Sequence, residues 1–75
     1  MTALPVISGR EAVKALNRAG FRVVRQRGSH VRLEKRTEER LIKLTVPLHK
    51  SLKKGTLRRI IKDSGLTVQE FNGLL

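Results

Sequence analysis

The chain contains two histidines, His30 and His49, and no cysteine. His30 follows the pair Gly28–Ser29 inside the segment RQRGSHVRL, residues 25–33. The arginines of this segment are Arg25, Arg27 and Arg32. Histidine can both accept and donate a proton near neutral pH, and arginines stabilise the negative charge that develops when a phosphodiester is attacked. The segment is therefore a candidate site for acid/base chemistry on a phosphodiester, although a single histidine in a turn is also a common structural residue.

The second histidine begins a basic run, HKSLKKGT, that follows Pro47 and Leu48. The lysines of this run that we expect to hold phosphate are Lys50, Lys53 and Lys54. Because the strand register derived below pairs Pro47 with His30, both imidazoles can fall within reach of one phosphodiester, one as base and the other as acid. RNA supplies its own nucleophile, the 2′-hydroxyl, so this chemistry needs no metal or other cofactor, and neither histidine has an Asp, Glu or Cys at metal-ligand spacing. The alternative is that His49 only holds phosphate.

The charge of the chain favours a polyanionic partner. Its 75 residues include 17 lysines and arginines and 6 acidic residues, which gives a net charge of +11. The cations are interleaved with well-patterned segments and do not line one long amphipathic helix, so nucleic acid is favoured over a membrane surface, while an acidic protein fits equally well. Phe21 and Phe71 are the only Phe, Tyr or Trp residues, so contact with RNA is expected to rely on phosphates and shape and not on base stacking.

The length predicts one domain, residues 1–75, with no disulfide staple and no thiolate metal site. No stretch approaches the roughly 20 apolar residues of a membrane span, and the N-terminus lacks a basic segment followed by an apolar core. We therefore expect a cytoplasmic protein without a membrane partner.

Hydrophobic periodicity predicts the order helix, three strands, helix, helix. Two capping-box patterns precede predicted helices, Ser8 to Glu11 and Thr67 to Glu70. The first helix covers about residues 9–19 and ends at Gly20. Period-two patterning then predicts strands in FRVVRQR, HVRLEKR and LIKLTVP. Helical spacing returns in KKGTLRRIIKDSG, where Gly65 caps the C-terminus, and a short helix in TVQEF follows.

Three antiparallel strands with the helices on one face make a two-layer α+β domain of order αβββαα, and the other face of the sheet stays open. A two-residue turn of type II′ at Gly28–Ser29 and a loop over residues 37–40 set the register. The predicted pairs are Arg27–His30, Arg25–Arg32, Val24–Leu33, Arg36–Leu41, Leu33–Leu44, Val31–Val46 and His30–Pro47. The helix-covered face then carries Val24, Val31, Leu33, Ile42, Leu44 and Val46. The open face carries Arg25, Arg27, His30, Arg32, Lys43 and Thr45.

The pair Arg25–Arg32 sets two like charges directly opposite each other, which destabilises a sheet by roughly a few tenths of a kcal/mol or more. An anionic ligand would relieve this repulsion. We therefore interpret the open face as a platform that binds RNA phosphates through Arg25, Arg27, Arg32 and Lys43. The alternative is a solvated basic face that only keeps the protein soluble.

Several segments together resemble one known family. They are AGF at the end of the first helix, RQRGSH, TVPLHKSLKKGTLRRIIKDSGLT and a closing EF. The chain resembles the HicA (YcfA-like) toxins of type II toxin-antitoxin pairs from about Ser8 to Phe71. The most specific parts are the turn Gly28-Ser29-His30 and the stretch that runs from Pro47-Leu48-His49 to Gly55-Thr56-Leu57.

The resemblance implies a fold like that of double-stranded-RNA-binding domains, ribosome-independent cleavage of mRNA and neutralisation by a HicB-type antitoxin. It assigns the essential catalytic role to His30 and leaves the role of His49 open. We therefore expect a metal-independent endoribonuclease toxin, an mRNA interferase, with His30 in acid/base catalysis and His49 as the candidate second proton carrier. Two alternatives stay open: a non-catalytic RNA-binding module with the same fold, and an interaction protein whose basic face serves an acidic partner.

Overall fold

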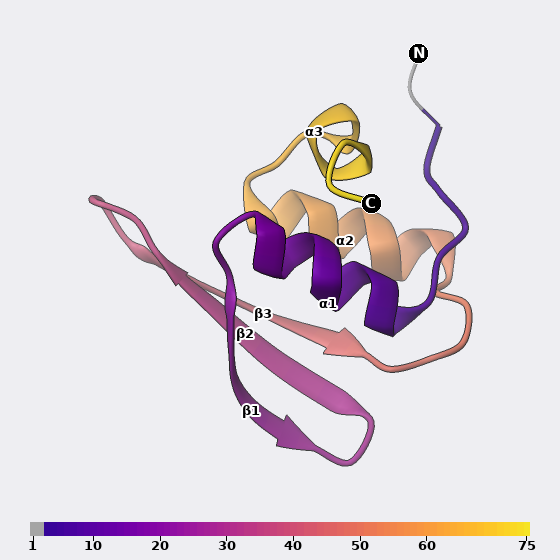
Figure 1. Ribbon diagram of the computed structural model, residues 1–75, viewed down its shortest axis with the longest axis horizontal. Coiled ribbons are helices and arrows are strands. Elements are labelled where there is room, and N and C mark those ends of the chain that lie inside the picture. The colour runs from indigo at the N-terminus through magenta and orange to yellow at the C-terminus, as the bar shows by residue number, and fades with distance from the viewer. Residues whose placement is uncertain (1–2) are drawn as a thin grey trace.

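The computed structural model describes residues 3–75 and shows a three-stranded sheet with helices on one face (Figure 1). The elements are α1 (Gly9–Arg18), β1 (Arg22–Arg27), β2 (His30–Arg36), β3 (Leu41–Pro47), α2 (Lys54–Ser64) and α3 (Val68–Asn72). The predicted order αβββαα and the two-layer α+β architecture with an open sheet face are confirmed.

Local capping interactions begin α1 and α3. The Ser8 hydroxyl accepts a hydrogen bond from the Glu11 N–H at 3.1 Å, and the Glu11 carboxylate accepts one from the Ser8 N–H at 3.0 Å. Thr67 and Glu70 form the same two bonds at 3.0 Å and 2.9 Å. Both predicted capping boxes are therefore present, and they satisfy backbone donors that the first turn of a helix leaves free.

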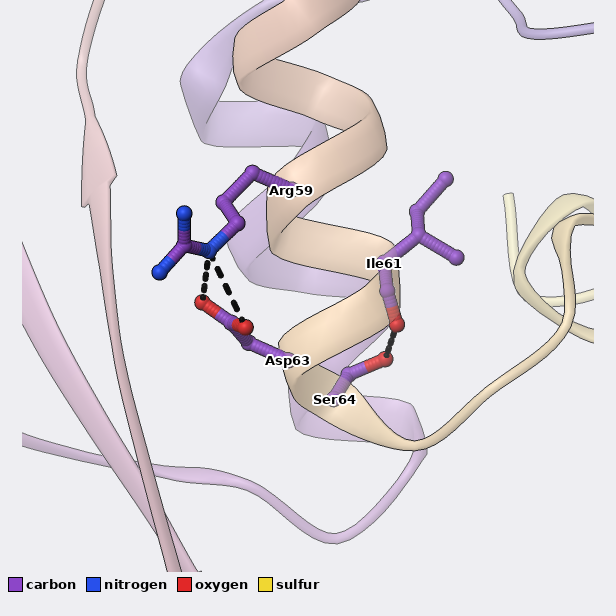
Figure 2. Close-up of polar contacts among 4 residues, drawn as sticks. All are labelled: Arg59, Ile61, Asp63 and Ser64. Carbon is purple, nitrogen blue, oxygen red and sulfur yellow. Dashed lines mark hydrogen bonds and ion pairs between the residues drawn. The ribbon is translucent and has the colours of Figure 1, made fainter.

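The end of α2 is also set by local interactions. Gly65 has a left-handed backbone with φ of 80°, as the predicted C-terminal cap requires. On the buried side of the helix, the Ser64 hydroxyl donates a hydrogen bond to the Ile61 carbonyl oxygen at 2.6 Å (Figure 2). On another side, Arg59 Nε lies 3.2 Å from both carboxylate oxygens of Asp63 (Figure 2). This ion pair is exposed, so it adds at most about 1 kcal/mol to stability.

The hydrophobic core lies between the sheet and the helices. α2 lies on β3, and α1 contacts β1 and β3 (Figure 1). The sheet contributes Val31, Leu33, Leu44 and Val46, and the helices contribute mainly Ala12, Ala15, Leu16, Leu57, Ile60, Ile61 and Phe71. The Arg18 guanidinium also donates to the Leu74 carbonyl oxygen at 2.6 Å, which ties the C-terminal end to α1. Within residues 3–75, no helix has the length and apolar character needed to cross a membrane.

The sheet runs in the order β1-β2-β3, and both strand pairs are antiparallel. The predicted pairs between β2 and β3 are all present: His30–Pro47, Val31–Val46, Leu33–Leu44 and Arg36–Leu41. Between β1 and β2, the predicted pairs Arg27–His30 and Arg25–Arg32 are also present. The open and helix-covered faces of β2 and β3 are therefore those predicted from the turns.

The predicted pair Val24–Leu33 is wrong, because β1 contains a β-bulge between Val23 and Arg25. Leu33 pairs with Val23, and Val24 is the extra residue. Strict alternation of side chains along a strand would place Phe21 and Arg25, which are four residues apart, on the same face. In the structure Phe21 is buried in the core and Arg25 lies on the open face, so one extra residue is needed between them. The bulge provides this residue. As a result Val24 does not join the core, and the residue is 49% exposed.

Candidate nucleic-acid interface

The open face of the sheet contains a hollow of about 280 Å³ near the turn between β1 and β2, hereafter the arginine hollow. Its lining residues are Arg25, Arg27, His30, Arg32 and Thr45, and all five are exposed. The register explains the grouping, since Arg32 lies between Arg25 on β1 and Thr45 on β3. His30 lies opposite Arg27 at the end of the same ladder. The structure therefore places His30 together with the three arginines that surround it in the sequence.

The turn before β2 positions His30 as the first residue of that strand. Gly28 has φ of 59°, and Ser29 has a negative φ, as a type II′ turn requires. A Cβ atom at Gly28 would meet no atom within 4 Å, so glycine is needed for its backbone conformation and not for space. The Gln26 side chain donates from Nε2 to the Gly28 carbonyl oxygen at 3.2 Å. The turn thus holds His30 directly opposite Arg27.

Carboxylates do not balance the positive charge of the arginine hollow. Arg25 and Arg32 lie directly opposite each other across the ladder. Within residues 3–75, the ion pair found is that of Arg59 and Asp63 on α2, which belongs to the helix layer. Like charges opposed in this way repel each other, and an anion between them is attracted by both. The hollow is therefore chemically suited to a phosphate group.

The segment after β3 is held beside the same turn. Leu48 donates its N–H to the Ser29 carbonyl oxygen at 2.6 Å, and Gly9 donates its N–H to the His49 carbonyl oxygen at 2.9 Å. The start of α1 comes so close to this segment that a Cβ atom at Gly9 would overlap the Pro47 carbonyl oxygen. These contacts fix the backbone of His49 next to the turn that precedes β2.

Gly9 is a residue that sequence reasoning missed. It is buried and is the first residue of α1. Helix propensity favours alanine over glycine, so a glycine directly after the Ser8 cap is the signal that another part of the chain passes close to the helix. The structure identifies that part as the peptide group between Pro47 and Leu48.

The other predicted site residues lie outside the arginine hollow. Lys43 lies on the open face, opposite Glu34. The loop before α2 and the start of that helix carry three exposed lysines, Lys50, Lys53 and Lys54. His49 is exposed but does not line the hollow. The structure therefore groups His30 with the arginines and does not bring the two histidines into one hollow.

The hollow offers one imidazole, three guanidinium groups and one hydroxyl, from Thr45. The register predicted the face on which Thr45 lies, but its residue type indicated no role. In the described residues, no three His, Cys, Asp or Glu side chains gather closely enough to hold a metal ion. The groups present can bind an oxyanion and transfer a proton.

A family model described as the HicA toxin of bacterial toxin-antitoxin systems matches residues 9–66 of the chain. The chain belongs to the HicA toxin family. The matched range runs from the first residue of α1 to just beyond α2, so it contains the arginine hollow and the segment that carries His49. Comparison with curated proteins found no match. The resemblance seen in the sequence is therefore confirmed: this HicA toxin belongs to a toxin-antitoxin system, in which an antitoxin is the partner.

Proposed function

We propose that this toxin is a metal-independent endoribonuclease, an mRNA interferase, that cleaves RNA in the arginine hollow with His30 in acid/base catalysis. The observation that carries the proposal is the grouping of one imidazole with three guanidinium groups on an exposed sheet face. The guanidinium groups attract a phosphate, and the imidazole lies beside it. Membership of a toxin family supports the proposal, because cleavage of mRNA would stop growth.

In the proposed reaction, the 2′-oxygen of RNA attacks the adjacent phosphorus, so that a new bond forms there while the bond to the 5′-oxygen breaks. The 2′-hydroxyl gives its proton to a base, and the leaving 5′-oxygen takes a proton from an acid. His30 carries out one of these two transfers. Arg25 and Arg32 stabilise the charge that builds up on the phosphorane oxygens. The products are a 2′,3′-cyclic phosphate and a 5′-hydroxyl.

His49 is the candidate for the other proton transfer. Its backbone is held next to the turn through the Gly9 hydrogen bond to its carbonyl oxygen. Its side chain is exposed outside the arginine hollow, so a catalytic role requires RNA to extend from the hollow to this segment. If His49 transfers a proton, His49→Ala should be about as severe as His30→Ala. If it only holds phosphate, the effect on cleavage should be clearly milder.

Cations around the hollow extend the proposed RNA-binding surface. Lys43 lies on the same face, and the further contacts are Lys50, Lys53 and Lys54. For a single strand, each phosphate that is neutralised contributes about −0.7 to the slope of log K against log salt concentration. Two or three contacts in the hollow therefore correspond to a slope between about −1.4 and −2.1.

We also propose that a HicB-type antitoxin neutralises the toxin by covering the open sheet face. α1 and α2 cover only the other face, so the arginine hollow is accessible to a partner (Figure 1). Carboxylates of the antitoxin would pair with Arg25, Arg27 and Arg32 and shield His30. RNA and antitoxin should then compete, and Arg32→Glu should weaken both. An inhibited complex that binds RNA as tightly as the free toxin, with His30 still modified by diethyl pyrocarbonate, would contradict this.

Turnover separates the proposal from its rival, a non-catalytic RNA-binding module. His30→Ala should lower the rate of cleavage of a labelled RNA by about 10²–10⁴-fold, while the variant stays folded and still binds RNA. Growth arrest on expression should disappear in the His30→Ala variant.

Cleavage by the parental protein should continue in excess EDTA, and a 2′-deoxy nucleotide at the cut site should block cleavage. A folded His30→Ala variant that cuts at the parental rate would refute the assignment, and a parental protein that binds RNA without cutting it would support the rival.

A further inference from the structure

The open face holds a second hollow of about 400 Å³ at the other end of β2 from His30, hereafter the bulge hollow. It is lined by Gly20, Arg22, Val24, Glu34, Lys35, Arg36 and Leu41. Glu34 and its partner Arg22 lie on the open face, because Glu34 alternates along β2 with Leu33, which is buried under the helices. Arg36 and its partner Leu41 continue the same face. Most of its lining therefore lies on the same surface of the sheet as the arginine hollow, while Lys35, the partner of Ile42, belongs to the helix-covered face.

The β-bulge brings an aliphatic side chain into this hollow. Val24 is 49% exposed, and its neighbour Val23 is 47% exposed. Val23 nevertheless belongs to the other side of β1, where it lines a separate hollow with Val13 and Leu48. In the bulge hollow, Leu41 is a second exposed aliphatic residue, with 36% of its surface accessible. Val23 and Val24 thus have nearly equal exposure but line hollows on opposite sides of the strand.

The chemistry of the bulge hollow fits a protein better than RNA. Its apolar part, Val24 and Leu41, has no complement on a phosphate backbone. Its cations are Arg22, Lys35 and Arg36, and the carboxylate of Glu34 among them weakens their attraction for phosphate. A protein surface can offer an apolar side chain to the valine and leucine, carboxylates to the arginines and a cation to Glu34. The arginine hollow, which contains no carboxylate among its lining residues, is the part of the face that suits RNA.

The charge of the chain also argues against a second copy as the occupant. A net charge of +11 makes two copies repel each other, whereas an acidic partner is attracted. Arg22 and Arg36 flank the apolar part of the bulge hollow, so a partner with carboxylates around an apolar side chain is complementary to it. For a toxin of this family, the partner with which it is paired is the antitoxin.

We propose that the bulge hollow anchors the antitoxin: an apolar antitoxin side chain packs between Val24 and Leu41, and flanking carboxylates bind Arg22 and Arg36. This inference rests on the proposed covering of the open face by the antitoxin and not on the cleavage of RNA. His30 and Arg36 are six residues apart along β2, which corresponds to about 20 Å. An antitoxin that fills both hollows therefore gains apolar contacts at a place where RNA does not compete, in addition to covering His30.

The test compares two adjacent valines that differ in the side of β1 they serve. Val24→Glu and Val23→Glu change the net charge of the toxin equally, and both positions are about half exposed. The toxin carries His30→Ala throughout so that it can be expressed, and the probe is the purified product of the reading frame that adjoins the toxin gene. Val24→Glu should weaken binding of this antitoxin at least about tenfold, and Val23→Glu less than about threefold. RNA binding should change equally in both variants.

Thermal unfolding of each variant shows whether it is folded, and Leu41→Ser and the nearly isosteric Val24→Thr repeat the test with smaller changes in the strand. Equal weakening by the two valine variants, or stronger weakening by Val23→Glu, would overturn the proposal; the second result would move the anchor to the hollow between α1 and β1. If Arg32→Glu weakens antitoxin binding and Val24→Glu does not, only the anchor is wrong. If neither weakens it, the proposed covering of the open face is wrong as well.

Discussion

The two faces of β2 differ in what their residues contribute to the protein. Val31 and Leu33 are buried against the helix layer, whereas His30 and Arg32, which alternate with them, are exposed on the open face. Burial of apolar surface on the covered face stabilises the fold, while the like charges gathered on the open face oppose it. One strand therefore carries stability on one side and the candidate site on the other. Substitutions on the two faces should affect different measurements.

The largest effect on stability is expected on the covered face. Leu33 is fully buried, so Leu33→Ala should lower the free energy of unfolding by about 2–5 kcal/mol, a large part of the total for a small domain. The matched variant Leu41→Ala, on the open face, should lower it by about 1 kcal/mol or less, and His30→Ala by about 0.5 kcal/mol or less. Urea unfolding followed by circular dichroism measures all three. Equal losses at Leu33 and Leu41 would contradict the division between the faces.

A second, smaller effect on stability is expected where Gly9, at the start of α1, contacts the segment after β3 that carries His49. Gly9→Ala should destabilise the toxin by about 1–3 kcal/mol, because the new Cβ atom overlaps the Pro47 carbonyl oxygen and the backbone must move. The control is Gly55→Ala in α2, where a Cβ atom meets nothing within 4 Å; it should stabilise by up to about 1 kcal/mol. Thermal unfolding of both variants shows whether each substitution lowers or raises the stability of the toxin. Stabilisation by Gly9→Ala would show that the close approach is absent in solution.

On the open face, stability and RNA binding should respond in opposite directions. Arg32→Thr removes the repulsion with Arg25, so the free energy of unfolding should rise by about 0.2–1 kcal/mol. The slope of log K for RNA against log salt concentration should become less negative by about 0.7. Lys43→Thr is the control for stability, since Lys43 lies opposite Glu34 and its removal should not stabilise. Thermal unfolding and filter binding over a range of salt concentrations measure the two quantities. A fall in stability with Arg32→Thr would mean that the pair is not repulsive.

The smallest effect on stability is expected from the negative charge of Glu11 in the first turn of α1. The pKa of the Glu11 carboxyl is held below its ordinary value of 4.5. The larger cause is the hydrogen bond from the Ser8 backbone N–H, and the smaller cause is the hydrogen bond with the Ser8 side chain. A lower pKa in the folded state means that the ionised carboxylate stabilises the fold above its unfolded pKa, and that this contribution is lost as pH falls through the folded pKa. Glu11→Gln should therefore be less stable than the parent at neutral pH, and the difference should shrink as pH falls below 4.5. A difference in urea midpoint that is the same at every pH would contradict this.

Much of the fold and part of the site followed from local sequence signals. The capping boxes at Ser8 and Thr67 and the cap at Gly65 involve residues only a few positions apart, so they act in the same way in any surroundings. The two-residue turn at Gly28–Ser29 likewise sets the pairing of Arg27 with His30 and of Arg25 with Arg32. Because pairing and alternation decide which side chains share a face, the grouping of His30 with its arginines could be predicted from the sequence.

Two features were decided only by the tertiary structure, and each depends on segments that are distant in sequence. The bulge at Val24 arises because Phe21 must reach the core that the helices complete, while Arg25 keeps the register set by the turn. The path of the segment after β3, and with it the place of His49 outside the arginine hollow, depends on the close approach of Gly9 to Pro47. Alternation along one strand contains no information about either contact, since packing against another element sets both.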